Sequence, residues 1–151
     1  LRNLGSDVKF KHDLIGMNSR LDNLQAIILN HKLRPLSKLN SKRRKIASEY
    51  DNKIINKKIQ KLKYSKFSIY HQYVLIVKKR NELIKYLKKA KIQYGFHYPY
   101  AIHQLDAFKK YFKREKFPNS EMLAKNGISI PIDPNLSKKE IDYIISRLNS
   151  F

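Results

Sequence analysis

The sequence lacks cysteine altogether and contains only four glycines in 151 residues. Without cysteine, disulfide bonds and thiolate chemistry are excluded. The glycines form neither a P-loop nor a G-x-G-x-x-G fingerprint. No apolar run approaches the roughly 18–20 residues that span a bilayer, and the polar stretch at the start has no signal-peptide pattern. These absences favour a cytoplasmic protein with no membrane association.

Positive charge is in excess, because 33 Lys and Arg residues face 12 Asp and Glu residues and give a formal net charge of +21. The densest basic stretch runs from Lys32 to Lys66. A nucleic-acid binder steered by phosphate electrostatics would show such a stretch. However, 25 of the 33 residues are Lys, beside 18 Ile and 12 Asn. That mixture is typical of an AT-rich genome, whereas nucleic-acid readers depend more on Arg. Solvated helix faces are therefore favoured, and binding to nucleic acid or an anionic surface stays the alternative.

Apolar residues at helical spacing predict several helices. A helix is expected from Leu21 onward, with Asp22 at its start, and Pro35 should break it from a second helix that continues to about Ile54. The later predicted helices cover residues 83–90, 105–112 and 119–126, the last started by Pro118 and ended by Gly127 as a C′ residue. Ser137 and Glu140 form a capping-box pattern at the start of a final helix.

Three stretches predict strands: residues 69–77, 92–97 and 128–130. The order of elements indicates an α/β or α+β fold, in which two long N-terminal helices precede a small sheet flanked by helices. Those long helices need a large surface to bury against, and this chain is not expected to supply all of it.

Two segments could carry chemistry. Asn18 and Arg20 stand just before the first predicted helix, where an amide and a guanidinium suit an anion such as phosphate. Alternatively, Asn18 caps the helix and Arg20 is a surface charge. His97, Tyr98 and His103 lie in a loop-like segment and either line a polar pocket or are ordinary loop residues. Histidine spacing indicates no metal site, and the sequence shows no catalytic motif.

A family resemblance emerges from the order of several short motifs. Residues 16–26 resemble the G-x-N-x-R…L-Q-A segment of the DegT/StrS class of sugar aminotransferases, which are fold-type I enzymes dependent on pyridoxal phosphate (PLP). Residues 44–50 resemble the R-x-x-I-A-x-x-Y helix of that class, with Arg43 at the first position of the motif, and residues 95–103 resemble its H-Y-P-x-x-x-H segment. The matching continues in family order, with Tyr73-Val74-Leu75-Ile76, Arg80, Phe117-Pro118, Glu121, Ile130-Pro131 and Leu136-Ser137. It covers nearly the whole chain.

The resemblance implies amino transfer, usually from glutamate, to a keto-sugar attached to a nucleotide, with PLP as the electron sink. It implies a homodimer with shared active sites and a role in amino-sugar and surface polysaccharide biosynthesis. By the match, residues 1–20 are the tail of the large PLP domain with a cofactor-contact loop, and residues 21–151 are linking helices and the small C-terminal domain. Asn18 would reach the PLP phosphate of the partner subunit, Arg20 would be a further phosphate or structural contact, and His97, Tyr98 and His103 would lie near the sugar nucleotide.

The departures from the family pattern concern the catalytic centre. None of the 25 lysines matches the Schiff-base lysine, which precedes this region in the family. The first residue is Leu1, so an upstream part is expected, and the chain alone is expected to be inactive and not to bind PLP tightly. Ser19 stands where the family usually has an aromatic residue. A decayed or truncated gene product that folds poorly is a third interpretation.

Overall fold

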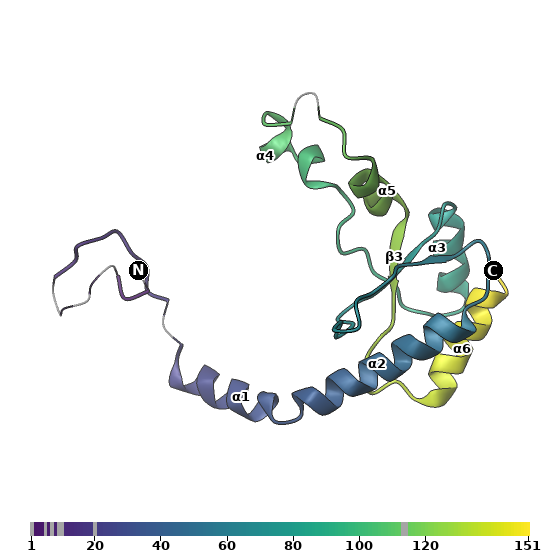
Figure 1. The fold of residues 1–151 in the computed structure, drawn as a ribbon, viewed down its shortest axis with the longest axis horizontal. Coiled ribbons are helices and arrows are strands. Elements are labelled where there is room, and N and C mark those ends of the chain that lie inside the picture. The colour runs from purple at the N-terminus through teal and green to yellow at the C-terminus, as the bar shows by residue number, and fades with distance from the viewer. Residues whose placement is uncertain (1, 5, 7, 9–10, 20, 113–114) are drawn as a thin grey trace. The chain divides into compact units, whose positions relative to one another are not determined.

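The computed structural model describes residues 2–4, 6, 8, 11–19, 21–112 and 115–151. The chain forms two compact units, Leu1–Lys38 and Leu39–Phe151 (Figure 1). Each unit is described by itself below.

The first unit contains a segment folded back on itself and one helix. Residues 2–4 run antiparallel to residues 17–19, with backbone hydrogen bonds from Leu4 N to Met17 O (3.1 Å) and from Ser19 N to the carbonyl oxygen of residue 2 (2.9 Å). The helix α1 (Asn23–Leu33) follows, with Asp22 as its N-cap. This start agrees with the prediction.

No residue of α1 is buried. Its apolar stripe is largely open to solvent, with Leu24 70% and Ile27 67% exposed. The described part of the chain therefore does not bury the apolar stripe of α1, and a covering surface from elsewhere stays a prediction. The break at Pro35 is also confirmed, because α1 ends at Leu33 and α2 (Leu36–Lys53) begins after the proline.

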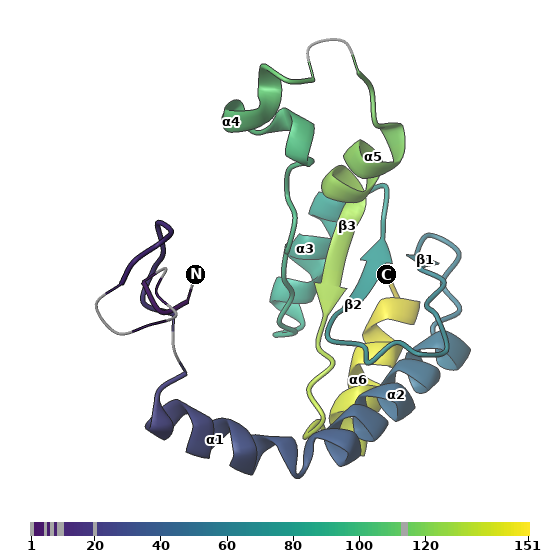
Figure 2. The ribbon, with the colours of Figure 1, turned by 60° about the vertical axis from the view of Figure 1, so that its left-hand side comes forward.

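The second unit is built on a three-stranded antiparallel sheet in the order β1 (Gln60–Lys61), β2 (Tyr73–Ile76) and β3 (Gly127–Ile130) (Figure 2). Side chains alternate between the two faces of a strand. The register pairs Tyr73 with Ile130 and Leu75 with Ile128 on one face, and Val74 with Ser129 on the other. The sheet therefore has one apolar face and one face that is partly polar.

Three helices cover the apolar face: α2, α3 (Arg80–Lys89) and α6 (Lys138–Asn149) (Figure 2). Their buried side chains join those of the strands in one core, which includes Ile46, Ala47, Tyr50, Leu83, Leu87, Ile141, Ile144, Ile145 and Leu148. The capping box at the start of α6 is present as predicted, since Glu140 N donates to Ser137 Oγ (3.3 Å) and Ser137 N donates to the Glu140 carboxylate (2.7 Å). The predicted α+β architecture, with a small sheet flanked by helices, is confirmed.

Two predicted elements differ from the structure between α3 and β3. Residues 92–97 form no strand, because only Gly95 reaches β3, through a single bridge to Ser129. Ile92 is buried in the core instead. The predicted helix over residues 105–112 is replaced by a 3-10 turn, η1 (Ile102–Gln104), and one helical turn, α4 (Asp106–Lys109).

The α5 helix (Pro118–Asn126) starts at the predicted proline and leads directly into β3. Gly127 ends this helix, as predicted, but as its C-cap and not as a C′ residue. It has φ −72° and ψ 137°, which is extended backbone. The reason for glycine is steric, since a Cβ at this position would lie 2.6 Å from the carbonyl oxygen of Leu123.

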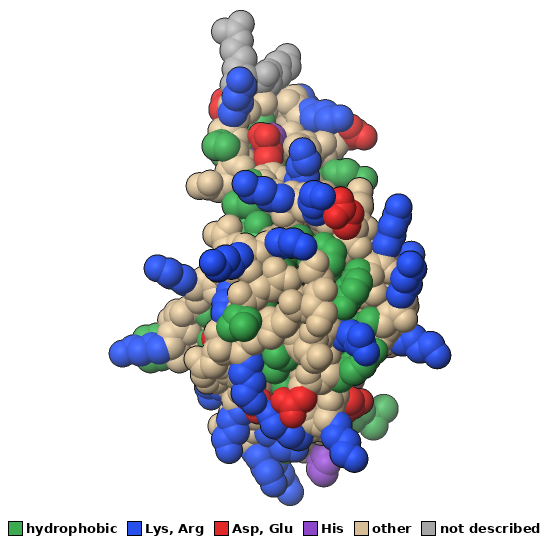
Figure 3. All heavy atoms as spheres, turned by 90° about the vertical axis from the view of Figure 1, so that its right-hand side faces the viewer, with side chains coloured by type: hydrophobic (Ala, Val, Ile, Leu, Met, Phe, Trp, Pro, Cys, Tyr) green, Lys and Arg blue, Asp and Glu red, His purple; other side chains and the backbone are tan. Residues whose placement is uncertain are grey.

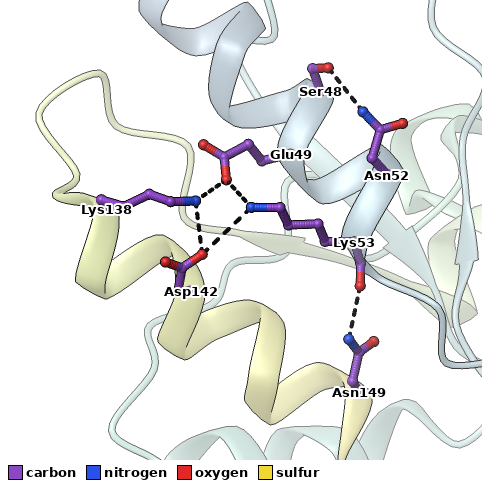
Figure 4. A network of polar contacts seen from close by, with 7 residues as sticks. All are labelled: Ser48, Glu49, Asn52, Lys53, Lys138, Asp142 and Asn149. Atoms are coloured by element: carbon purple, nitrogen blue, oxygen red, sulfur yellow. Dashed lines mark hydrogen bonds and ion pairs between the residues drawn. The ribbon is translucent and has the colours of Figure 1, made fainter.

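An ion-pair network joins the polar sides of α2 and α6 (Figure 4). Glu49 accepts hydrogen bonds from both Lys53 (2.8 Å) and Lys138, and Asp142 accepts one from Lys138 (2.9 Å). Asn149 adds a bond from its amide to the carbonyl oxygen of Lys53 (2.8 Å). These contacts fix how the two helices lie against each other above the core.

This network should make stability depend on pH. The hydrogen bonds from Lys138 and Lys53 hold the pKa of Glu49 below its ordinary value. A carboxylate with a lowered pKa stabilises the fold fully above its ordinary pKa, and that contribution is lost as pH falls through the lowered pKa. We expect Glu49→Gln to lower the thermal midpoint modestly at neutral pH, because exposed pairs contribute little, and hardly at all in acid. Calorimetry at neutral pH and in acid measures the thermal midpoint of each variant. Replacement of the exposed Glu82 by Gln is the control. An equal loss in acid and at neutral pH would contradict the assignment.

Candidate functional site

The partly polar face of the sheet is hollowed. A hollow of about 690 Å³ lies in the second unit, over β2 and β3 and beside the segment that follows α3. Aliphatic residues share its lining with aromatic and histidine side chains, which are Tyr64, Tyr70, His71, Phe96, His97, Tyr98 and Tyr100. Arg80 supplies a fixed positive charge. Among the described residues that line the hollow, none is a carboxylate. Such a site suits an anionic ligand with a flat or ring-shaped part.

Arg80 is held rigidly at this wall. Its Nη1 donates to the carbonyl oxygens of Ala124 (2.7 Å) and Gly127 (3.2 Å), and its guanidinium lies 4.8 Å from the centre of the Phe96 ring. Its Nε is buried and has no hydrogen-bond partner among the described residues. A buried donor without a partner is costly, so Nε is an unsatisfied polar atom behind the wall of the hollow.

The tyrosines of the hollow pack on one another. The Tyr64 ring lies 4.9 Å from Tyr70 and 6.1 Å from Tyr73, and Val74 N donates a hydrogen bond to the Tyr64 hydroxyl (3.0 Å). Burial raises the pKa of the Tyr64 and Tyr70 phenols. Both side chains therefore stay neutral at physiological pH and offer apolar ring faces with hydroxyl tips.

The structure brings two of the three predicted substrate residues to the hollow. His97 and Tyr98 line it, and Nδ1 of His97 lies 2.9 Å from the hydroxyl of Ser129. The pocket interpretation of this segment is thus the one that the geometry favours over an ordinary loop.

His103 lies elsewhere in the same unit and is not among the lining residues of the hollow. Its Nε2 pairs with the Glu121 carboxylate at 3.0 Å, and its side chain is only 12% exposed. Its ring also packs 4.9 Å from Phe117. The contact between His103 and Glu121 thus joins η1 to the start of α5. This contact supports the segment that carries Tyr98.

Asn18 and Arg20 belong to the first unit. Arg20 lies outside the described residues, so its predicted role is not addressed by the structure. Asn18 is exposed, and its side chain has no hydrogen-bond partner among the described residues. It does not cap α1, because the N-cap is Asp22, so that alternative is wrong. An exposed amide with free N–H donors fits a phosphate oxygen.

Comparison with known proteins identifies the family. The model of the DegT/DnrJ/EryC1/StrS aminotransferase family matches residues 1–149. The chain belongs to this family. The dTDP-3-amino-3,6-dideoxy-alpha-D-galactopyranose transaminase of Aneurinibacillus thermoaerophilus is 37% identical over 100% of this chain and 42% of its own length. The UDP-2-acetamido-2-deoxy-3-oxo-D-glucuronate aminotransferase of Pseudomonas aeruginosa is 30% identical over 97% of the chain and 41% of its own length.

Solved structures of the aminotransferase family agree with the fold. DesV of S. venezuelae, crystallised with a ketimine intermediate, has a TM-score of 0.90 at 28% identity, over 99% of this chain and 42% of DesV. A family member from Brucella abortus has a TM-score of 0.86 at 27% identity, over 97% of the chain and 40% of its own length. The chain thus spans about two fifths of the length of the relatives it matches.

Positive charge is widespread on the surface. Lysine and arginine side chains are spread over the face in Figure 3, with several close together at its lower end and a few carboxylates among them. No helix in the described part of the chain is long and apolar enough to cross a membrane.

Sequence reasoning missed several residues of the hollow, above all Arg80 and Ser129. In the sequence, Arg80 stands out only as one of the residues that carry the family resemblance. The signal for Ser129 was present, since a lone hydroxyl stands between two isoleucines in a predicted strand.

Proposed function

We propose that this chain is the C-terminal part of a PLP-dependent aminotransferase that acts on a nucleotide-linked keto-sugar, for amino-sugar and surface polysaccharide biosynthesis. The observation that carries the proposal is the hollow, which offers Arg80, His97 and several tyrosines and no carboxylate among its described lining residues. Phosphates pair with cationic and N–H donors, and rings pack on aromatic faces. A sugar nucleotide has both parts.

Within this proposal, residues 1–20 belong to the PLP domain and its cofactor-contact loop, and residues 21–151 form linking helices and the small domain. His97 and Tyr98 contact the sugar nucleotide. The enzyme works as a cytoplasmic homodimer with shared active sites and takes the amino group from glutamate. The exposed apolar stripe of α1 supports an additional protein surface packed on that helix.

The residues present fit only part of the PLP site. The amide of Asn18 would hold the phosphate of the cofactor, with Arg20 as a further contact from the same segment. When bound, PLP supplies the electron sink for amino transfer, while the protein binds, orients and tunes it. The lysine that holds PLP covalently in this family has no match among the 25 lysines of the chain.

The test is amination by the whole gene product that carries these residues. Purified protein receives L-glutamate and a dTDP- or UDP-linked keto-sugar, and mass spectrometry follows the amino-sugar nucleotide and 2-oxoglutarate. We expect the two products in equal amounts. As control, residues 1–151 produced alone should neither aminate the sugar nor retain PLP through dialysis. Absence of amination by the whole product across both nucleotides would overturn the proposal, and so would PLP retention with a visible absorption band by residues 1–151 alone.

A further inference from the structure

Ser129 is a polar residue in an apolar strand. It lies in the middle of β3, between Ile128 and Ile130, and is only 8% exposed. Its backbone exchanges two hydrogen bonds with Gly95, at 2.9 and 3.0 Å, which fix the chain two residues before His97. The side chain of Ser129 points to the face of the sheet that carries the hollow, as the register with Val74 shows.

The hydroxyl of Ser129 has one hydrogen-bond partner among the described residues, Nδ1 of His97 at 2.9 Å. A buried hydroxyl that finds no acceptor for its proton costs free energy. No other hydrogen bond of this hydroxyl is found among the described residues. Donation from Oγ to Nδ1 satisfies the hydroxyl within the protein.

This donation selects the tautomer of His97. A neutral imidazole has one donor and one acceptor nitrogen, and the hydrogen bond of one nitrogen determines the state of the other. If Nδ1 accepts, then Nε2 carries the hydrogen. His97 itself is exposed at the hollow, so Nε2–H is available to a ligand.

We propose that Ser129 is a positioning residue, which holds His97 so that its Nε2–H donates to a phosphate or sugar oxygen of the nucleotide-linked substrate in the hollow. The inference rests on the proposed function for the identity of the ligand. The Ser129–His97 pair itself does not depend on that function, and the two are tested separately.

The first experiment reads the tautomer directly. The 151-residue chain is labelled with ¹⁵N-histidine, and the imidazole nitrogens are observed at a pH where the histidines are neutral, with His97→Gln used to assign the signals. We expect His97 in the Nε2–H form, and a several-fold rise of its Nδ1–H form in Ser129→Ala. His71, which also lines the hollow but makes no contact with Ser129, should keep its tautomer ratio. Ser129→Thr keeps the hydroxyl and should restore the wild-type signal. Unchanged imidazole signals of His97 in folded Ser129→Ala would contradict the hydrogen bond from Ser129 Oγ to His97 Nδ1.

The second experiment uses the whole, active gene product and the nucleotide-linked keto-sugar. Loss of one oriented hydrogen bond is worth about a two- to tenfold change, and we expect it as a rise in KM with little change in kcat. In a His97→Gln background, Ser129→Ala should have no further effect, because the two residues act through one contact. A tautomer change with an unchanged KM would overturn the contact with substrate. Absence of amination in the wild type would instead reject the proposed function. The tautomer experiment would then still test the hydrogen bond between Ser129 and His97.

Discussion

Replacing Leu148 by alanine should remove much of the stability of the second unit. Leu148 is fully buried in the core where α6 meets the helices and strands of this unit. Its backbone is also hydrogen-bonded to a side chain, because the Asn56 amide donates to the carbonyl oxygen of Leu148 (2.8 Å). The variant loses the free energy of transferring the removed atoms from water into the core. If the core does not collapse around the gap, the cavity destabilises the unit further. We therefore expect a loss of about 2–5 kcal/mol in the free energy of unfolding, a large part of a typical total of about 5–15 kcal/mol.

Urea denaturation followed by circular dichroism measures this loss, with Leu105→Ala as the control. Leu105 is a leucine of the same unit that is 40% exposed, and surface replacements usually stay within about 0.5 kcal/mol. Equal losses for the two variants would show that the core described here is not the one that holds the domain together.

Gly127→Ala should also destabilise the second unit, although it adds only a methyl group. The new Cβ would lie 2.6 Å from the carbonyl oxygen of Leu123 and 3.7 Å from a methyl carbon of Val74. The near neighbour is backbone and cannot swing away, so α5 or β3 must shift. Overpacking of this kind costs about 1–3 kcal/mol. The shift would also strain the bonds from Arg80 to Ala124 O and Gly127 O.

Gly95→Ala is the matched control, because it makes the same chemical change on the neighbouring stretch. A Cβ on Gly95 would meet only Cε1 of His97, at an ordinary contact distance of 3.5 Å. Its thermal midpoint should stay near the wild-type value, whereas that of Gly127→Ala falls by several degrees. A wild-type midpoint for Gly127→Ala would refute the steric reason given for this glycine.

The elements that local chemistry determines could be predicted from sequence. The capping box of Ser137 and Glu140, the break at Pro35 and the start of α5 at Pro118 need only their own neighbours. The buried face of α6 likewise follows from local spacing, since Ile141, Ile144, Ile145 and Leu148 stand at helical intervals.

Predictions were wrong where a distant partner decides the outcome. Residues 92–97 have the composition of a strand, yet only Gly95 pairs with β3, and Ile92 is buried in the core. Gly127 was interpreted by the commonest role of a glycine after a helix, although its reason is a close approach to Leu123 O.

The candidate site was predictable only in part for the same reason. His97 and Tyr98 were identified from the resemblance, and the fold places them at the hollow. The pairing of His97 with Ser129 joins residues 32 positions apart, and that of His103 with Glu121 joins residues 18 apart. Such pairs depend on the path of the chain between α3 and β3, which no local pattern specifies.

The measurement that tests the central claim most directly is the coding sequence on the 5′ side of the Leu1 codon. Amino transfer by this family needs a lysine that binds PLP, and no lysine of the chain matches it. The account predicts an in-frame extension with a lysine shortly before Leu1 and an aspartate further upstream. An in-frame stop codon close to Leu1, with no such lysine encoded nearby, would contradict the assignment of these 151 residues to a working aminotransferase.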